Sequence, residues 1–326
     1  MKPNIAIVCG GDSKEIDVSI KSAQGLYSFI DKNRYNLFIV KIIGKEWTVE
    51  MSDYETLNID KNDFSFTHKS TKTIFDFAYI TIHGTPGENG VLQGYFELLR
   101  IPYSCCGVLA AALTFDKFAC LEFLKNYNIQ SAKSLCFSKN EQIDINIIAQ
   151  KIGFPCFVKP CAGGSSFGVS KVKSQNDLQP AVNKAFAEGE KIMIEKFIDG
   201  KELTCGMYRT KTKTVVFPVS EVVPKNDFFD YDAKYNGAVE EITPARITKE
   251  LTEEIQQLTE KIYQILDCKG IIRIDYIVDK NEKINLLEVN TTPGMTQTSF
   301  IPQQVRAAGL NITDVLTEII ENKIHF

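Results

Sequence analysis

The chain has 326 residues, of which 44% are hydrophobic, which is enough for two or three domains with buried cores. Its 37 Lys and Arg residues nearly balance its 41 Asp and Glu residues, and no basic run or basic stripe interleaved with aromatics occurs. This balance argues against nucleic acid and a membrane as partners, so we expect small-molecule partners. No apolar stretch of roughly 18 residues and no signal sequence occurs, which predicts a cytoplasmic protein.

The cysteines indicate a reducing compartment. They number nine, include no Cys-x-x-Cys pair, and are accompanied by only three histidines. We expect reduced cysteines in the core, with a reactive thiol as the alternative, and we do not expect a zinc site.

The first hundred residues alternate apolar strands with amphipathic helices. We predict strands at residues 4–11, 36–43 and 75–84, and helices at 17–30 and 89–99. This alternation predicts an α/β domain with a parallel sheet covered on both faces, and with ligand loops at the carboxyl ends of its strands. Gly10 and Gly11 follow the first strand, but the G-x-G-x-x-G spacing is missing, which argues against a nicotinamide enzyme.

A different pattern follows Ser104. We predict a helix capped by Thr114 and running to residue 126, strands at 131–137, 154–160, 169–172 and 191–198, a helix at 175–188, a hairpin at 202–223 that turns at 211–213, a helix at 249–266, a second hairpin at 270–289, and two short helices. Residues 224–243 have little periodicity but contain four aromatics, which predicts a lid over a site.

The second hairpin carries polar residues on one strand face. Arg273 and Asp275 alternate along its first strand, and Glu288 and Asn290 alternate along its second. A solvated surface ion pair is one interpretation, but the apolar flanks indicate burial, and buried charges need compensation. A pair of divalent cations would supply it. Two carboxylates and one amide oxygen suit magnesium that takes further ligands from phosphates, so we predict metal ligation by Asp275, Glu288 and Asn290.

Two further stretches suit a nucleotide. Lys159 ends a strand directly before the loop at 163–168, where glycines let backbone N–H groups approach phosphate oxygens, although a plain hairpin turn would have similar composition. In the stretch IMIEKFIDGKE, apolar side chains and backbone groups could hold a purine, and Glu202 could accept hydrogen bonds from ribose. Glu195 and Glu202 would otherwise be ordinary surface carboxylates.

With these residues, the sequence resembles the D-alanine–D-alanine ligases of the ATP-grasp superfamily. The motifs that carry the resemblance, in order over nearly the whole chain, are GGDSKEIDVS, HGTPGENGVLQGYFELLRIPYSCCG, FDK, FVKPCAGGSSFGVSKV, IEKFIDGKELT, FFDYDAKY, RIDY and LLEVNTTPGMTQTSF. The resemblance implies an N-terminal α/β substrate domain (1–104), a central ATP-grasp lobe with the phosphate loop (105–196), and a C-terminal lobe with the lid and metal site (197–326). It also implies a homodimer.

The implied reaction joins two D-alanine molecules through an acyl phosphate, for peptidoglycan precursors, and uses ATP with two Mg²⁺ or Mn²⁺ ions. The implied nucleotide contacts are Lys117 and Lys159 with the phosphates, Gly164 and Ser166 in the loop, and Glu195, Ile198 and Glu202 with adenine and ribose. Alternatives are a ligase with another acceptor, such as a D-hydroxy acid or another D-amino acid, and a nucleotide-binding module without catalysis.

The resemblance also implies substrate contacts. Glu15 would receive the ammonium of the first D-alanine and would be held by Ser165 and Tyr235. Arg273 and the backbone of Gly294 would stabilise the tetrahedral oxyanion.

The second D-alanine would be held by its carboxylate. Ser299 and Lys234 match the clamp on that group, and Ser299 stands before Phe300-Ile301-Pro302, an N-cap signal that suits a bound anion. His83 is expected near the first substrate, with a purely structural histidine as the alternative. Two positions depart from the usual family pattern, because Gly163 replaces an acidic residue and Phe300 replaces an aliphatic one and could narrow the acceptor pocket.

Overall fold

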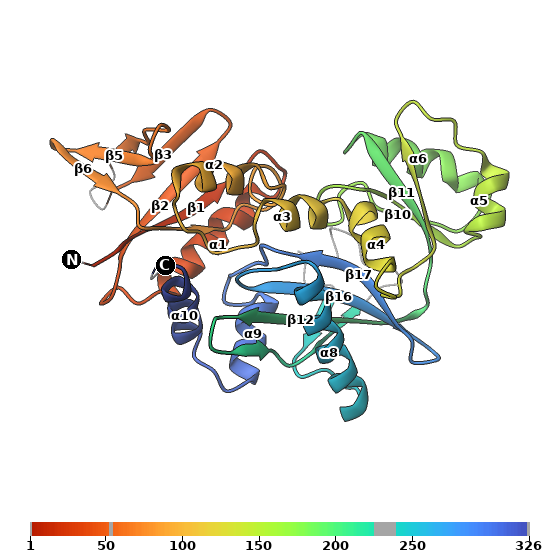
Figure 1. Cartoon of the computed structure of the whole chain (residues 1–326). Coiled ribbons are helices and arrows are strands. Elements are labelled where there is room, and N and C mark those ends of the chain that lie inside the picture. Colours follow the sequence, from red (N-terminus) through yellow and green to blue (C-terminus); the bar gives the residue numbers. More distant parts are fainter. Residues whose placement is uncertain (1, 52–54, 225–238, 325–326) are drawn as a thin grey trace.

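The computed structural model describes residues 2–51, 55–224 and 239–324, which form three α/β parts around a common centre (Figure 1). The N-terminal sheet lies on the left of the view, the central lobe on the right, and the C-terminal lobe below them. Helix α10, Ile312–Ile324, returns to the N-terminal part and packs against α1, Ile16–Phe29. The two ends of the chain therefore share one hydrophobic core, to which Leu26 and Leu316 both belong.

The N-terminal sheet has the strand order β4-β3-β2-β1-β7. Its strands are β1 Asn4–Gly10, β2 Asn36–Ile43, β3 Glu46–Glu50, β4 Thr56–Asn58 and β7 Phe77–Ile80, and a separate hairpin is formed by β5 Ser65–His68 and β6 Thr71–Ile74. The parallel pairing of β1 with β2 and β7 is as predicted. The prediction of an all-parallel sheet is wrong at its other edge, where β3 and β4 pair antiparallel, because Gly44 adopts φ +53° and reverses the chain between β2 and β3.

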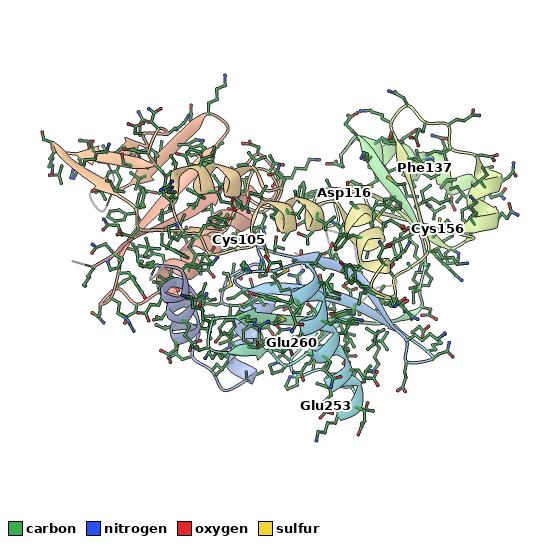
Figure 2. The ribbon with its side chains drawn as sticks, viewed as in Figure 1. Cys105, Asp116, Phe137, Cys156, Glu253 and Glu260 are labelled. Carbon is green, nitrogen blue, oxygen red and sulfur yellow. The ribbon has the colours of Figure 1, made fainter. Side chains whose placement is uncertain are left out.

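Three helices connect the N-terminal sheet to the two lobes: α2 Val91–Leu99, α3 Val108–Phe115 and α4 Lys117–Lys125. The prediction that Thr114 caps a helix is wrong, since Thr114 lies inside α3, where its hydroxyl donates to the carbonyl of Ala110 at 2.8 Å. Asp116 is the cap of α4, because its extended backbone breaks the helix and its carboxylate accepts from the N–H of Ala119 at 3.0 Å. Asp116 lies between the two helices in Figure 2.

The central lobe is an antiparallel sheet, in the order β10-β9-β11-β8, covered by helices. Its elements are β8 Ser134–Ser138, α5 Ile145–Lys151, β9 Cys156–Pro160, β10 Ser170–Val172, a 3₁₀ turn at Gln175–Asp177, α6 Leu178–Phe186 and β11 Lys191–Lys196. The predicted helix at 175–188 begins as the 3₁₀ turn because Ser174 and Asp177 form a capping box ahead of α6.

The C-terminal lobe has the strand order β15-β14-β12-β16-β17, with β13 also paired to β12. Its elements are β12 Gly200–Arg209, β13 Thr214–Val216, β14 Ser220–Pro224, β15 Val239–Ile242, α8 Lys249–Ile265, β16 Ile272–Asp279, β17 Ile284–Asn290 and α9 Phe300–Ala307. Both predicted hairpins are confirmed as antiparallel pairs, β12 with β13 and β16 with β17. Helix α8 covers one face of this sheet through Leu251 and Ile255.

The cysteines are placed as the sequence predicts. All nine lie in the described part of the chain and are free thiols, and eight of them are buried, including Cys105 and Cys156 (Figure 2). Burial raises the pKa of the Cys105 thiol to about 12, which makes it unreactive near neutral pH.

Among the described residues, no helix has the length and apolar character needed to cross a membrane.

Candidate active site

The central and C-terminal lobes enclose a cavity of about 440 Å³, within the size range of small-molecule sites. Most of the predicted site residues line it: Lys117, Lys159, Gly164, Ser165, Ser166, Glu195, Ile198, Glu202, Arg273, Asp275, Glu288 and Phe300. These residues come from four separate stretches of the sequence, at 117, 159–166, 195–202 and 273–300. The antiparallel sheets of the two lobes therefore bring the predicted phosphate, base and metal groups to one cavity.

Two predicted nucleotide-binding residues pair with each other. Lys159 on β9 and Glu195 on β11 lie on neighbouring strands, and both are buried. The Nζ of Lys159 is 2.7 Å from Oε1 of Glu195. Each charge compensates the other, which a buried ion requires.

The three predicted metal ligands converge at the cavity wall. Asp275 and Glu288 oppose each other in the β16–β17 register, and the side-chain amide nitrogen of Asn290 lies 3.1 Å from Asp275 Oδ2 and 3.4 Å from Glu288 Oε1. Within the described ranges, no group of three or more His, Cys, Asp or Glu side chains is arranged to hold a metal. The predicted set of ligands instead combines two carboxylates with one amide. The donor chemistry fits magnesium or manganese, once the Asn290 amide presents its oxygen.

Cations already compensate these carboxylates. Arg273 makes two hydrogen bonds to Asp275, of 2.9 and 2.7 Å, and Lys117 lies 3.4 Å from Glu288. Burial lowers the pKa of Arg273, but the charge of Asp275 and the hydrogen bonds to it outweigh burial, so the net pKa is well above its usual value. The guanidinium carbon of Arg273 lies 5.6 Å from the centre of the Phe300 ring. Arg273 is therefore a fixed positive charge held between a predicted metal ligand and the start of α9.

The glycine-rich loop contacts the N-terminal domain. The hydroxyl of Ser165 donates a hydrogen bond to the buried carboxylate of Glu15, as the resemblance implied. A Cβ at Gly164 would lie 2.5 Å from Oε2 of Glu15, so a side chain at this position would displace the Glu15 carboxylate. Ser165 and Ser166 both adopt left-handed backbone conformations, with φ of +50° and +58°, which bends the loop tightly above the cavity.

The predicted acceptor region is formed by the start of α9. Ser299 occupies the N-cap position, but its side chain does not cap α9 and instead accepts from the N–H of Thr296 at 3.0 Å. A Cβ at Gly294 would lie 3.0 Å from the Ser299 hydroxyl, so these two predicted residues are neighbours. Predicted residues Lys234 and Tyr235 lie outside the described residues, as does most of the predicted lid.

The comparisons with known proteins agree with this geometry. Residues 4–106 match the family "D-ala D-ala ligase N-terminus" and residues 123–321 match the family "D-ala D-ala ligase C-terminus". The chain belongs to the D-alanine–D-alanine ligase family. It is 63% identical over 323 residues to a D-alanine–D-alanine ligase of Bacteroides fragilis, which covers 99% of this chain and 100% of the relative. The corresponding ligase of Porphyromonas gingivalis is 49% identical over 325 residues, 99% of this chain and 98% of the relative.

Solved structures confirm the ATP-grasp ligase fold. D-alanyl-alanine synthetase A of Vibrio cholerae superposes with a TM-score of 0.90 at 27% identity, covering 100% of this chain and 99% of that one. The VanG D-Ala:D-Ser ligase of Enterococcus faecalis superposes with a TM-score of 0.89 at 29% identity, covering 99% of both chains. Relatives in this family thus include a ligase with a different second amino acid.

The site of this family member also contains residues that our sequence analysis did not identify. Glu88 accepts from the N–H of Gly84 at 2.7 Å, and burial, followed by the charge of Glu15, raises its pKa to about 8. The hydroxyl of Ser13 donates to the carbonyl of His83 at 2.8 Å and accepts from the N–H of Glu15 at 3.2 Å, which ties His83 to Glu15. The quoted HGTPGENG motif contains Glu88, so its position after a glycine turn was the available signal.

Thr204 on β12 is a second residue that we missed. It is buried opposite Asp275, and its hydroxyl donates to Oδ1 of Asp275 at 2.6 Å. Because β12 and β16 are neighbours, alternation along β12 directs Thr204 to the metal face, which is the sheet face that carries Asp275 and Glu288. That pairing is a long-range contact, which the local sequence pattern could not establish.

Proposed function

We propose that this protein condenses two D-alanine molecules into D-alanyl-D-alanine, with cleavage of ATP to ADP and phosphate, as a step of peptidoglycan precursor synthesis. The observation that carries the proposal is the hydrogen bond from Ser165 to Glu15. It joins the loop suited to ATP phosphates to a buried carboxylate suited to an amino acid's ammonium. The carboxylate of a D-alanine bound there would face the γ-phosphate.

Two magnesium or manganese ions fit the site best through Asp275, Glu288 and Asn290. When bound, they would neutralise charge on the phosphates, which is the main requirement of phosphoryl transfer. Lys117 and Lys159 supply further positive charge at the glycine-rich loop. Burial lowers the pKa of Lys117, but the nearby carboxylates Glu288 and Glu88 raise it more, so the side chain stays cationic.

The remaining steps use the chain's own donors. The first D-alanine carboxylate attacks the γ-phosphate to give an acyl phosphate and release ADP. The amine of the second D-alanine, once it has lost its proton, then attacks that carbonyl, forms the peptide bond and releases phosphate. Arg273 and the backbone of Gly294 are suited to the oxyanion that develops, since donors held in place before the reaction stabilise it most. Ser299 and the amino end of α9 are suited to the carboxylate of the second D-alanine. Lys234 and Tyr235 have the roles that the family resemblance implies.

The choice of acceptor is the finest part of the proposal. The D-Ala:D-Ser ligase among the similar structures makes D-serine a specific rival acceptor. The test offers D-alanine, D-serine and D-lactate together with ATP and magnesium, and identifies the products by mass. We expect D-alanyl-D-alanine to predominate and ADP release to require magnesium. Predominance of another product would overturn the acceptor, and absence of ADP release would overturn the ligase.

We also propose that the protein is a homodimer and works in the cytoplasm, where ATP is supplied. Helices α2 and α3 expose Val91, Leu98 and Leu109 to 62, 85 and 79%. Large apolar side chains gathered on adjacent helices suit contact with a second copy. Light scattering on Leu98→Glu and the unmodified chain tests this. We expect a dimer that Leu98→Glu dissociates, and a monomeric unmodified chain would refute the proposal.

A further inference from the structure

Strand β12 has a break in its pairing along one edge. Thr204 pairs with Ser220 of β14, whereas Met207 pairs with Val216 of β13, so the chain between β13 and β14 leaves the ladder beside Gly206. The carbonyl of Gly206 is satisfied there by the N–H of Phe217 at 2.9 Å. The N–H of Gly206 and the carbonyl of Thr204 need other partners, because buried backbone groups rarely remain unpaired.

The side chain of Gln304 supplies those partners. Its Oε1 accepts from the N–H of Gly206 at 3.0 Å, and its Nε2 donates to the carbonyl of Thr204 at 3.0 Å. The carboxamide thus acts on β12 as a peptide group of a neighbouring strand would. Nε2 also donates to the hydroxyl of Ser220 at 3.1 Å, and Gln304 is fully buried.

These contacts connect two parts of the proposed site, the acceptor region at the start of α9 and the predicted metal ligands on β16 and β17. Gln304 lies on the second turn of α9, whose first residue Phe300 contacts Arg273. The Gln304 carboxamide also contacts Thr204, whose hydroxyl donates a hydrogen bond to the carboxylate of Asp275, a predicted metal ligand. We propose that Gln304 is a positioning residue that fixes the acceptor-binding start of α9 relative to the metal face of β16. This inference rests on the proposed function for the identity of the acceptor.

Gly206 supports the same interpretation. A Cβ at this position would lie 2.7 Å from Oε1 of Gln304 and 2.4 Å from the side chain of Ile301, also on α9. A glycine is therefore needed for α9 to approach β12 this closely. The side chains of Ile301 and Gln304 thus pack directly against the bare backbone of Gly206, and this contact sets the separation of the two elements.

The test substitutes Gln304→Met, which keeps the length of the side chain and removes its hydrogen bonds. We expect the KM for the second D-alanine to rise about tenfold and kcat to fall, because a small displacement of a substrate-positioning element has a large effect on rate. The KM for ATP should change less than the acceptor KM, since Lys159 and Glu195 lie on β9 and β11 of the other lobe. Hydrogen exchange of the Gly206 amide should accelerate in the unliganded protein, a readout independent of catalysis.

The matched control is Tyr208→Phe. Tyr208 is buried on the same strand, and its hydroxyl donates to Glu318 of α10 at 2.7 Å, so this substitution removes a partly buried hydrogen bond and leaves the contacts of Gln304 intact. We expect it to lower the melting temperature without changing the KM for the acceptor. If Gln304→Met does not fold, Ser220→Ala removes only one of the Gln304 contacts and should give a smaller shift in the same direction.

The outcomes separate the inference from the proposed function. An unmodified chain that forms no dipeptide overturns the proposed function and, with it, the acceptor named here. If the unmodified chain is active, an acceptor KM that Gln304→Met leaves unchanged, or changes no more than Tyr208→Phe does, overturns the inference alone. Unchanged exchange of the Gly206 amide in Gln304→Met also overturns it. When only Ser220→Ala folds, an acceptor KM equal to that of the unmodified chain has the same consequence.

Discussion

Lys159 and Glu195 form a buried ion pair, 2.7 Å between Nζ and Oε1, although the family resemblance gives them separate roles at the phosphates and at the base. Their strands are adjacent, so each side chain is the other's partner when no nucleotide is bound. ATP binding must then either share Lys159 between Glu195 and a phosphate or draw it away. The ion pair therefore stabilises the unliganded protein, and ATP binding must alter it.

The first prediction separates those two roles. Lys159→Met should lower the free energy of unfolding by about 3–5 kcal/mol, because it leaves Glu195 buried without its cation. The double variant Lys159→Met with Glu195→Gln should recover most of that stability, since neither charge remains. Both variants should bind ATP poorly, because the phosphates lose a positive charge. Urea unfolding and ATP titration measure the two effects, and ATP binding restored together with stability would contradict the phosphate role of Lys159.

The second prediction concerns the metal face. Glu288→Gln should keep the fold and reduce turnover by about two orders of magnitude or more, because the proposed metal site would lose a hard anionic ligand. The matched control is Glu253→Gln, on the exposed side of α8 (Figure 2), which should be fully active. Turnover is measured as ADP release over a range of magnesium concentrations. Normal activity of Glu288→Gln at ordinary magnesium would remove Glu288 from the set of metal ligands.

The third prediction is a pH dependence of stability. The pKa of Glu88 rises from 4.5 to about 8 in the folded protein, chiefly through burial and secondly through the charge of Glu15. Between these two pH values the folded state holds a proton that the unfolded state has lost, so rising pH destabilises the fold across this window. Below the window both states are protonated, and above it both are ionised.

Glu88→Gln should remove this contribution. We expect its melting temperature to decline less than that of the unmodified chain as the pH is raised from 5 to 8, with the unliganded proteins compared in the same buffers. Glu122→Gln, on the surface of α4, is the control and should follow the unmodified chain. Parallel melting curves for Glu88→Gln and the unmodified chain would show that Glu88 is ionised throughout this range.

Local patterns in the sequence were enough to predict the C-terminal hairpin and its polar face. Alternation places Arg273, Asp275, Glu288 and Asn290 on one face, and the register of β16 with β17 confirms it. The pairing of Lys159 with Glu195 could not be predicted in this way, because it depends on which strand lies between β8 and β9. The antiparallel edge at β3 was missed because the glycine turn at Gly44 was not weighed.

The buried polar network around Gln304 was also beyond local patterns. The sequence of a helix gives no indication of which strand a glutamine on it contacts. Its role becomes visible only when the unpaired backbone groups of β12 are known, and these result from the departure of the chain between β13 and β14 from the ladder. Features of this kind depend on three elements meeting, whereas sequence periodicity reports on one element at a time.

The last prediction concerns acceptor choice and the contact between Phe300 and Arg273. The ring centre lies 5.6 Å from the guanidinium carbon, and both side chains line the cavity. Leucine, an aliphatic residue of the kind that the family resemblance implies at this position, is smaller than phenylalanine and lacks its π face. Phe300→Leu should therefore enlarge the acceptor pocket and weaken a contact of about 0.5–2 kcal/mol that holds Arg273.

We expect Phe300→Leu to incorporate D-serine relative to D-alanine up to about tenfold more than the unmodified chain does, because pockets discriminate small differences in side-chain size only modestly. The measurement is a competition between equimolar D-alanine and D-serine, with the dipeptides separated by mass. Phe123→Leu, on the exposed surface of α4, is the matched control and should leave the product ratio unchanged. The decisive comparison is the product ratio at equal conversion, because a loss of total rate alone would follow from a displaced Arg273. If the ratio in Phe300→Leu equals that of the control, the ring of Phe300 does not limit the acceptor, and selection must lie in the backbone and hydroxyl groups around Ser299.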